Sequence, residues 1–97
     1  MEDARRIARH LVERQLAACV NIVPGATSIY TWKGAIEEAS ELMLIIKSSR
    51  PLFDALRTEL TKIHPYEVPE ILAVPIVDGA EPYLNWVEKG LRRDLTA

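Results

Sequence analysis

One stretch of seven residues concentrates the side chains best suited to bind a ligand: His64-Pro65-Tyr66-Glu67-Val68-Pro69-Glu70. Its prolines fix the backbone angle φ, which favours a preorganised site on a loop. We predict His64 as a metal ligand and Tyr66, Glu67 and Glu70 as ligand-binding residues. The alternative is that His64 only caps a helix, because an imidazole near a helix C-terminus interacts favourably with its carbonyls and its dipole.

No strong metal-binding signature accompanies this stretch, since CxxC, HxxxH and EF-hand spacings are all absent from the sequence. A soft metal would need more than one nitrogen and a few oxygens. A cation site built on His64 would therefore be easier to complete between subunits than within one chain.

A second group of candidates lies on a β-prone arm that begins near Thr27. Tyr30 and Trp32 are two residues apart, so on a strand they share one face. They could stack on a ligand, but tyrosine and tryptophan are also favoured at interfaces, and packing against a neighbouring subunit is the preferred interpretation. Lys33 or Lys47 would pair with an anion or with the glutamates of the arm. The predicted ligand-binding residues of this arm are Tyr30, Trp32, Lys33, Glu37, Glu41 and Lys47.

The sequence offers little for catalysis. Cys19 and His64 are the only candidates for a thiol–imidazole pair, and Cys19 lies in a small, apolar stretch that favours a buried structural cysteine. The glycines, at positions 25, 34, 79 and 90, occupy turn or cap positions and form no phosphate-binding loop. We expect a protein that is not an enzyme.

Composition narrows the class of protein. The 97 residues form one domain, 1–97, whose own core is marginal, so oligomerisation is expected. A net charge of −2 argues against nucleic-acid binding. No apolar run approaches the ~20 residues of a membrane span, and one cysteine suits a reducing compartment. We predict a cytoplasmic protein with neither nucleic acid nor membrane as a partner.

Hydrophobic periodicity predicts six elements in the order helix, strand, strand, helix, strand, helix. The two long strands form an antiparallel hairpin, with a bulge or bend at Pro24-Gly25-Ala26. The predicted elements are a helix over 3–17, strands over 19–33 and 36–47, a helix over 52–63, a strand over 70–77 and a helix from 81 to a stop at 90. This is an α+β, ferredoxin-like sandwich with helices on one face of an antiparallel sheet, lacking the usual first strand.

Four segments in this order and spacing resemble the CutA family of divalent-cation tolerance proteins. They are Leu16-Ala17-Ala18-Cys19-Val20-Asn21, Tyr30-x-Trp32-Lys33-Gly34, His64-Pro65-Tyr66-Glu67-x-Pro69-Glu70 and Tyr83-Leu84-x-Trp86. The resemblance implies a ferredoxin-like subunit in a homotrimer, with hairpins that reach over neighbouring subunits. It also implies a link to divalent-cation tolerance, with copper as the cation, and no established catalytic activity.

The chain departs from the family pattern in two places. The apolar strand that normally precedes the first helix has no counterpart in this sequence. Of two adjacent histidines that family members use for copper, only His64 is present, with Ile63 in the other position, and Cys19 lies on a different strand from the family's cysteine. We expect a trimer that binds a divalent cation or small ligand in clefts between subunits. The alternatives are a scaffold trimer and a signalling module like the PII proteins.

Overall fold

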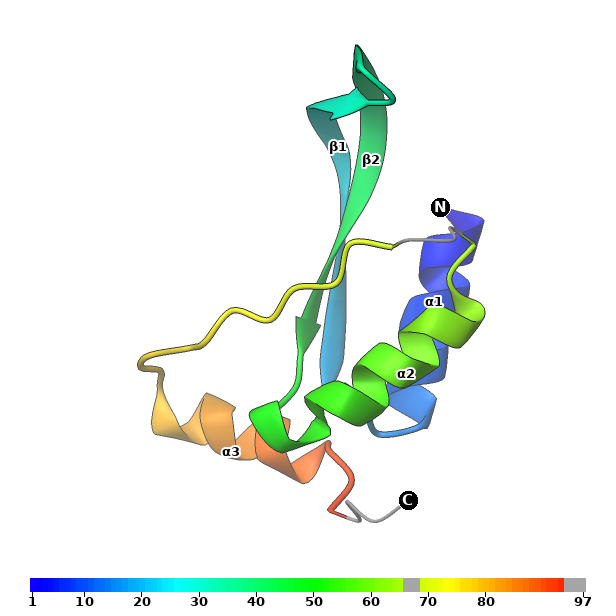
Figure 1. Cartoon of the computed structure of the whole chain (residues 1–97). Helices are drawn as coiled ribbons and strands as arrows, with labels where there is room; N and C mark the ends of the chain where they lie inside the picture. Colours follow the sequence, from blue (N-terminus) through cyan, green and yellow to red (C-terminus); the bar gives the residue numbers. More distant parts are fainter. Residues whose placement is uncertain (66–68, 94–97) are drawn as a thin grey trace.

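The computed structural model describes residues 1–65 and 69–93. One helix precedes a long β-hairpin, and the remaining helices follow it (Figure 1). In chain order they are α1 (Glu2–Glu13), β1 (Cys19–Trp32), β2 (Ala35–Lys47), the 3₁₀ helix η1 (Arg50–Leu52), α2 (Phe53–Ile63) and α3 (Glu81–Lys89). The predicted α+β class is confirmed, and so are the hairpin, the second helix and the last helix with its stop at Gly90.

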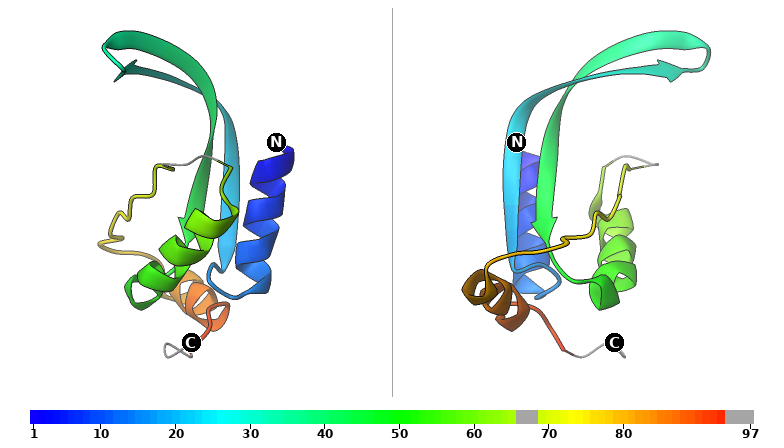
Figure 2. Two further views of the ribbon diagram at one scale, coloured as in Figure 1. Left: turned by 45° about the vertical axis from the view of Figure 1, so that its right-hand side comes forward. Right: turned by 90° about the vertical axis from the view of Figure 1, so that its left-hand side faces the viewer.

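β1 and β2 pair antiparallel along their whole length, from Cys19 opposite Lys47 to Trp32 opposite Ala35. The register shifts between Val23 and Ala26, where Pro24 and Gly25 stand opposite a single residue of β2. This is the predicted bulge, and Gly25 takes a positive φ of 86° there. Lys33 and Gly34 also have positive φ, 51° and 82°, as a two-residue hairpin turn requires. The hairpin therefore curves, and its far end stands clear of the helices in both views of Figure 2.

The core lies between one face of the hairpin's lower half and the two helices α1 and α2. Side chains alternate across a strand, so Val20, Leu44 and Ile46 share the face that packs against the buried cluster. The helices contribute apolar residues spaced three or four apart. That cluster consists of Ile7, Leu11, Leu16, Ala17, Leu56 and Leu60. Both helices thus cover the same face of the sheet, as predicted.

The predicted first helix is wrong at its C-terminal end, because α1 stops at Glu13 and not at 17. Gln15 has a φ of 58°, the amide of Gln15 donates to the Val12 carbonyl, and the amide of Leu16 donates to the Leu11 carbonyl. This is a Schellman ending with a non-glycine residue in the left-handed position. It turns the chain so that Leu16 and Ala17 enter the core from beyond the helix.

The predicted strand over 70–77 is also wrong as a sheet element. Within the described residues the sheet contains only β1 and β2, and 69–80 runs across the structure to α3 without strand pairing (Figure 1). A strand exists by hydrogen bonding to a neighbour, and no described strand lies beside this segment. Ile71 still packs against the core, but Leu72, Val74 and Ile76 are exposed by 78%, 83% and 69%.

The residues after α3 return to the start of the hairpin. The Arg92 amide donates to the Gln15 carbonyl at 2.8 Å, and Leu91 is buried. Gly90 lies so close to Ala18 that an added Cβ would meet the Ala18 Cβ at 3.0 Å. These contacts anchor one end of α3, whose own residues, all of them described, include none that is buried.

Replacement of Leu11 tests this core. Leu11 is fully buried (0% exposed), so Leu11→Ala leaves a cavity among packed side chains and should lower the free energy of unfolding by about 3–5 kcal/mol. Urea denaturation monitored by circular dichroism measures the change. Val12→Ala on the same helix is the control, because Val12 is 42% exposed, and should cost less than about 1 kcal/mol. Equal losses for the two variants would contradict the assigned core.

Candidate functional site

His64 marks the point where the chain leaves α2. It is the C-cap residue of that helix, with extended backbone angles (φ −74°, ψ 137°), and its amide donates to the Leu60 carbonyl at 2.8 Å. Its side chain is half-buried, whereas Glu70 is exposed. Tyr66 and Glu67 lie outside the described residues. The backbone amide of His64 makes the last hydrogen bond of the helix. Pro65 follows His64 and prevents the helix from continuing.

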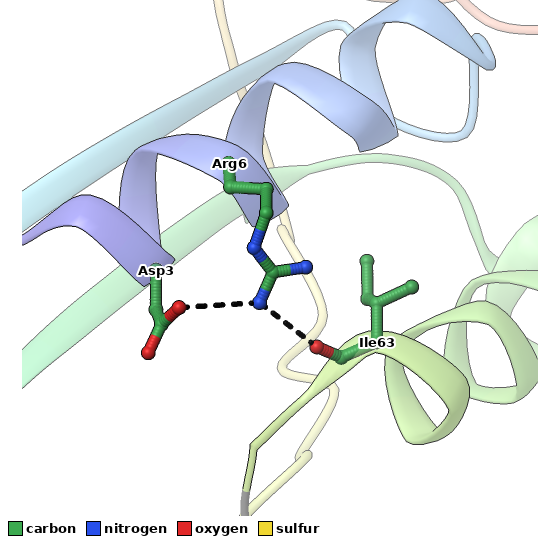
Figure 3. A network of polar contacts seen from close by, with 3 residues as sticks. All are labelled: Asp3, Arg6 and Ile63. Atoms are coloured by element: carbon green, nitrogen blue, oxygen red, sulfur yellow. Dashed lines mark hydrogen bonds and ion pairs between the residues drawn. The ribbon is translucent and has the colours of Figure 1, made fainter.

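The end of α2 is held by a side chain from α1. The Arg6 guanidinium donates to the backbone carbonyl of Ile63 at 3.2 Å and to the Asp3 carboxylate at 3.3 Å (Figure 3). A helix leaves its last carbonyls without intrahelical donors, and a cation at this end also matches the helix dipole. Arg6 therefore completes the end of the helix that carries His64, and sequence periodicity gave no indication of this role.

The aromatic and acidic candidates of the hairpin lie on its exposed far part. Tyr30 stands directly opposite Glu37, and Glu41 stands opposite Ala26 beside the bulge. The Lys33 ammonium lies 5.9 Å from the centre of the Trp32 ring, within the range of a cation–π interaction. Tyr30 and Trp32 remain 42% and 57% exposed. These side chains therefore form an accessible polar and aromatic surface without a covering element among the described residues.

Lys47 lies at the opposite end of the hairpin from these residues. Its ammonium donates to the side-chain carbonyl of Asn21 and lies 4.0 Å from the Cys19 sulfur, across the strand pair. The three residues share one face because Lys47 pairs with Cys19 and Asn21 is two residues further along β1. Lys47 is thus separated from Glu37 and Glu41 along the strand. Asn21 was not among the predicted residues, although strand alternation could have indicated it.

The two predicted groups do not meet within the described part of one chain. In both views of Figure 2 the far end of the hairpin stands clear of the segment that follows α2. Among residues 1–65 and 69–93, no three histidine, cysteine, aspartate or glutamate side chains lie close enough together to hold a metal ion. Within the described residues of one chain, the candidate ligands therefore do not form a cation site.

Apolar side chains remain uncovered in two further places, on the sheet and on α3. The sheet face turned away from the helices carries Val23, Met43 and Ile45, which are 40%, 52% and 47% exposed. On α3, the rings of Tyr83 and Trp86 stack with centroids 5.7 Å apart, yet both residues are about half exposed. Contiguous apolar surface of this kind marks an interaction site in a stable protein.

A second polar tie joins α1 to α2. His10 Nε2 lies 2.9 Å from Glu59 Oε1, with both side chains largely covered. The hydrogen bond with His10 lowers the pKa of Glu59, assisted by the charges of Lys62 and Arg14 and opposed by partial burial. The periodicity of α1 places His10 on its polar side, so the sequence alone did not predict this contact.

No helix within the described residues combines the length and apolar character needed to cross a membrane.

The chain is similar to known proteins over nearly its whole length. The family model described as CutA1 divalent ion tolerance protein matches residues 1–90. The chain belongs to the CutA family. A divalent-cation tolerance protein CutA from Thermus thermophilus is 51% identical over 88 residues, which is 91% of this chain and 85% of that protein. A solved structure from the same organism superposes with a TM-score of 0.90 at 49% identity, covering 94% of this chain and 88% of that one.

Other CutA relatives differ in length and in named compartment. Protein CutA from Mus musculus is 51% identical over 86 residues, but this chain, 89% of which is aligned, spans only 49% of it. A structure titled as a periplasmic divalent cation tolerance protein CutA, from Archaeoglobus fulgidus, has a TM-score of 0.90 at 40% identity and covers 95% of this chain and 89% of that one. The ferredoxin-like CutA fold is thereby confirmed, while a cytoplasmic location stays a prediction.

Acidification should weaken the tie between α1 and α2. Because the pKa of Glu59 is lowered in the folded chain, its contribution to stability is complete above the usual value of 4.5 and is lost as the pH falls through the lowered pKa. Glu59→Gln should cost less than about 1 kcal/mol at pH 7 and should remove part of the stability loss that sets in as the pH falls below 4.5. Urea midpoints at several pH values measure both effects.

Glu38→Gln on the exposed hairpin is the control for this titration and should keep the wild-type dependence on pH. An unchanged pH dependence in Glu59→Gln would show that the contact with His10 does not contribute to stability.

Proposed function

We propose that this CutA chain works as a non-catalytic homotrimer that binds a divalent cation, such as copper, or a small polar ligand in clefts between subunits. Two observations support the proposal. The described residues of one chain contain no cluster of side chains that could hold a metal, and they leave large apolar side chains uncovered. Neither nucleic acid nor a membrane is part of the proposed function.

Self-association is supported by the position of the exposed apolar residues. Val23, Met43 and Ile45 occupy one sheet face, and the backbone along the outer edges of both strands lacks a pairing partner within the described residues. An open edge beside an apolar face is a ready template for another copy. A chain of 10.9 kDa also buries a smaller fraction of its surface on folding than a larger domain does, so joining copies would enlarge a marginal core.

Ligand binding between copies is supported by the type and accessibility of the donors. His64 ends α2 beside a proline, Glu70 is exposed at the start of the unpaired segment, and the hairpin presents Tyr30, Trp32, Lys33, Glu37 and Glu41. Tyr66 and Glu67 are further proposed ligand-binding residues, chosen from the sequence alone. Lys47, at the base of the hairpin, is also a proposed ligand-binding residue. Imidazole and carboxylate groups suit a divalent transition metal, which requires several of them together.

A scaffold trimer is the second candidate, favoured by the same exposed apolar faces. In that case the polar residues would connect subunits and bind nothing else. A module of the PII type would instead bind a small effector in the same clefts. In the proposed function the cation is a bound ligand of the assembled protein, and none of these candidates requires catalysis.

The assembled state is tested by mass. Light scattering should give three times the 10.9 kDa of one chain. Ile45→Glu places a charge on the uncovered sheet face and should yield a folded protein of lower mass, because burial of an unpaired carboxylate between copies is costly. Thr58→Glu, on the exposed side of α2, is the control and should retain the wild-type mass. A monomeric wild type would remove the proposal.

The cation site is tested by calorimetric titration of the assembled protein with Cu²⁺. His64→Ala removes the proposed nitrogen ligand and should weaken binding by about tenfold or more, comparable to the loss seen when the surroundings of a metal ligand are removed. His10→Gln is the control, since His10 is the other histidine of the chain and is occupied with Glu59. Unchanged Cu²⁺ affinity in His64→Ala, together with a lower mass, would favour the scaffold.

A further inference from the structure

We propose that Arg6 is a positioning residue for His64: by holding the carbonyl of Ile63, the N-terminal helix sets the position of the Cα from which the His64 imidazole leaves α2. This inference rests on the proposed cation site at His64 and adds to it a determinant on a distant part of the sequence.

The peptide bond between Ile63 and His64 is held at both of its polar atoms. Its oxygen accepts the hydrogen bond from Arg6 at 3.2 Å, and its amide donates to the Leu60 carbonyl at 2.8 Å. Because a peptide unit is planar, holding both atoms fixes the orientation of the plane. The Cα of His64 is bonded to that plane, so the starting point of its side chain is fixed with it.

Arg6 is itself held in place for this contact. Asp3, one turn earlier on α1, lies 3.3 Å from the same guanidinium nitrogen that reaches Ile63 (Figure 3). Residues three apart on a helix are neighbours on its surface, so Asp3 restrains the guanidinium without crossing between elements. The three groups form a short chain from α1 to the end of α2.

The contribution of this chain to stability is small, which separates it from the packing of the helices. The Arg6 and Asp3 side chains are 53% and 64% exposed, so water competes for both hydrogen bonds. The helices are joined independently by the buried contacts of Ile7 and Leu11 with the α2 leucines and by the His10–Glu59 pair. Loss of Arg6 therefore removes one of the two hydrogen bonds that hold the Ile63–His64 peptide, while α1 stays docked on α2.

Two measurements on the assembled protein test the assignment. The first is the Cu²⁺ dissociation constant from calorimetry. The second is the NMR resonance of the His64 ring in metal-free protein, which His10→Gln distinguishes from the only other histidine. Arg6→Met keeps the aliphatic stem but removes every donor, so we expect the His64 resonance to move and Cu²⁺ binding to weaken by about tenfold. Arg6→Lys keeps a cationic donor and should restore most of the affinity.

Two control variants separate positioning from general loosening. Arg5→Met removes the same charge from the neighbouring residue of α1, and Glu59→Gln breaks the other polar tie between the helices. Both should leave the Cu²⁺ affinity and the His64 resonance at their wild-type values. An equal loss of affinity in Glu59→Gln and Arg6→Met would overturn the positioning role, because it would trace the effect to the packing of α1 on α2.

The failure of this inference is distinguishable from failure of the proposed function. If His64→Ala weakens Cu²⁺ binding while Arg6→Met changes neither affinity nor resonance, the cation site stands and the role of Arg6 is wrong. If His64→Ala binds Cu²⁺ as the wild type does, the cation site at His64 is wrong and its positioning by Arg6 fails with it.

Discussion

The hydrogen-bonded ladder between β1 and β2 supports everything else in the described structure, since both helices of the core pack on its one covered face. A two-stranded ribbon is a marginal sheet by itself and becomes stable by packing against other elements. In this chain α1 and α2 supply that packing on one side. The opposite face, with Val23, Met43 and Ile45, has no comparable cover within the described residues. One face of the ladder is thus covered inside the chain, and the other face is left partly exposed by the described residues.

The arrangement of α1 follows from this dependence on packing. Its buried stripe faces the sheet and α2, while its polar side chains reach α2 at two points, through Arg6 at the Ile63 carbonyl and through His10 at Glu59. The Arg6 contact is exposed and contributes little free energy, whereas the His10–Glu59 pair is largely covered. Their effect is geometric, because each hydrogen bond specifies how one helix lies along the other. The apolar contacts and the His10–Glu59 pair hold the helices together, and the Arg6 contact holds the end of α2 from which the His64 segment begins.

Local patterns predicted those elements whose cause is local. Alternation on β2, the Pro24–Gly25 bulge and the spacing of Leu56 and Leu60 each follow from neighbours in sequence, and each is present. The end of α1 was missed because Gln15, not glycine, takes the left-handed position, so no residue type indicated the turn. The strand over 70–77 was wrong because apolar β-branched residues favour a strand only where a neighbour pairs with them. The ties of Arg6, His10 and Lys47 join residues distant in sequence, which periodicity does not reveal.

The candidate site shows the same division between what one chain specifies and what it leaves open. Residue types and motif spacing predicted His64, Glu70 and the exposed hairpin residues as donors, but whether such residues act together depends on distances that local sequence does not set. A cation needs several oxygen or nitrogen atoms within a few ångströms of one point. Among the described residues of one chain, no three histidine, cysteine, aspartate or glutamate side chains lie close enough together to provide them. The uncovered surfaces are apolar and carry no ligand chemistry, while the candidate donors lie on the hairpin and at the end of α2. In the proposed trimer, association and ligand binding would be coupled: whatever orders the interface would also set the distances between donors, and a ligand that bridges copies would stabilise the assembly by the same free energy with which the assembly binds it.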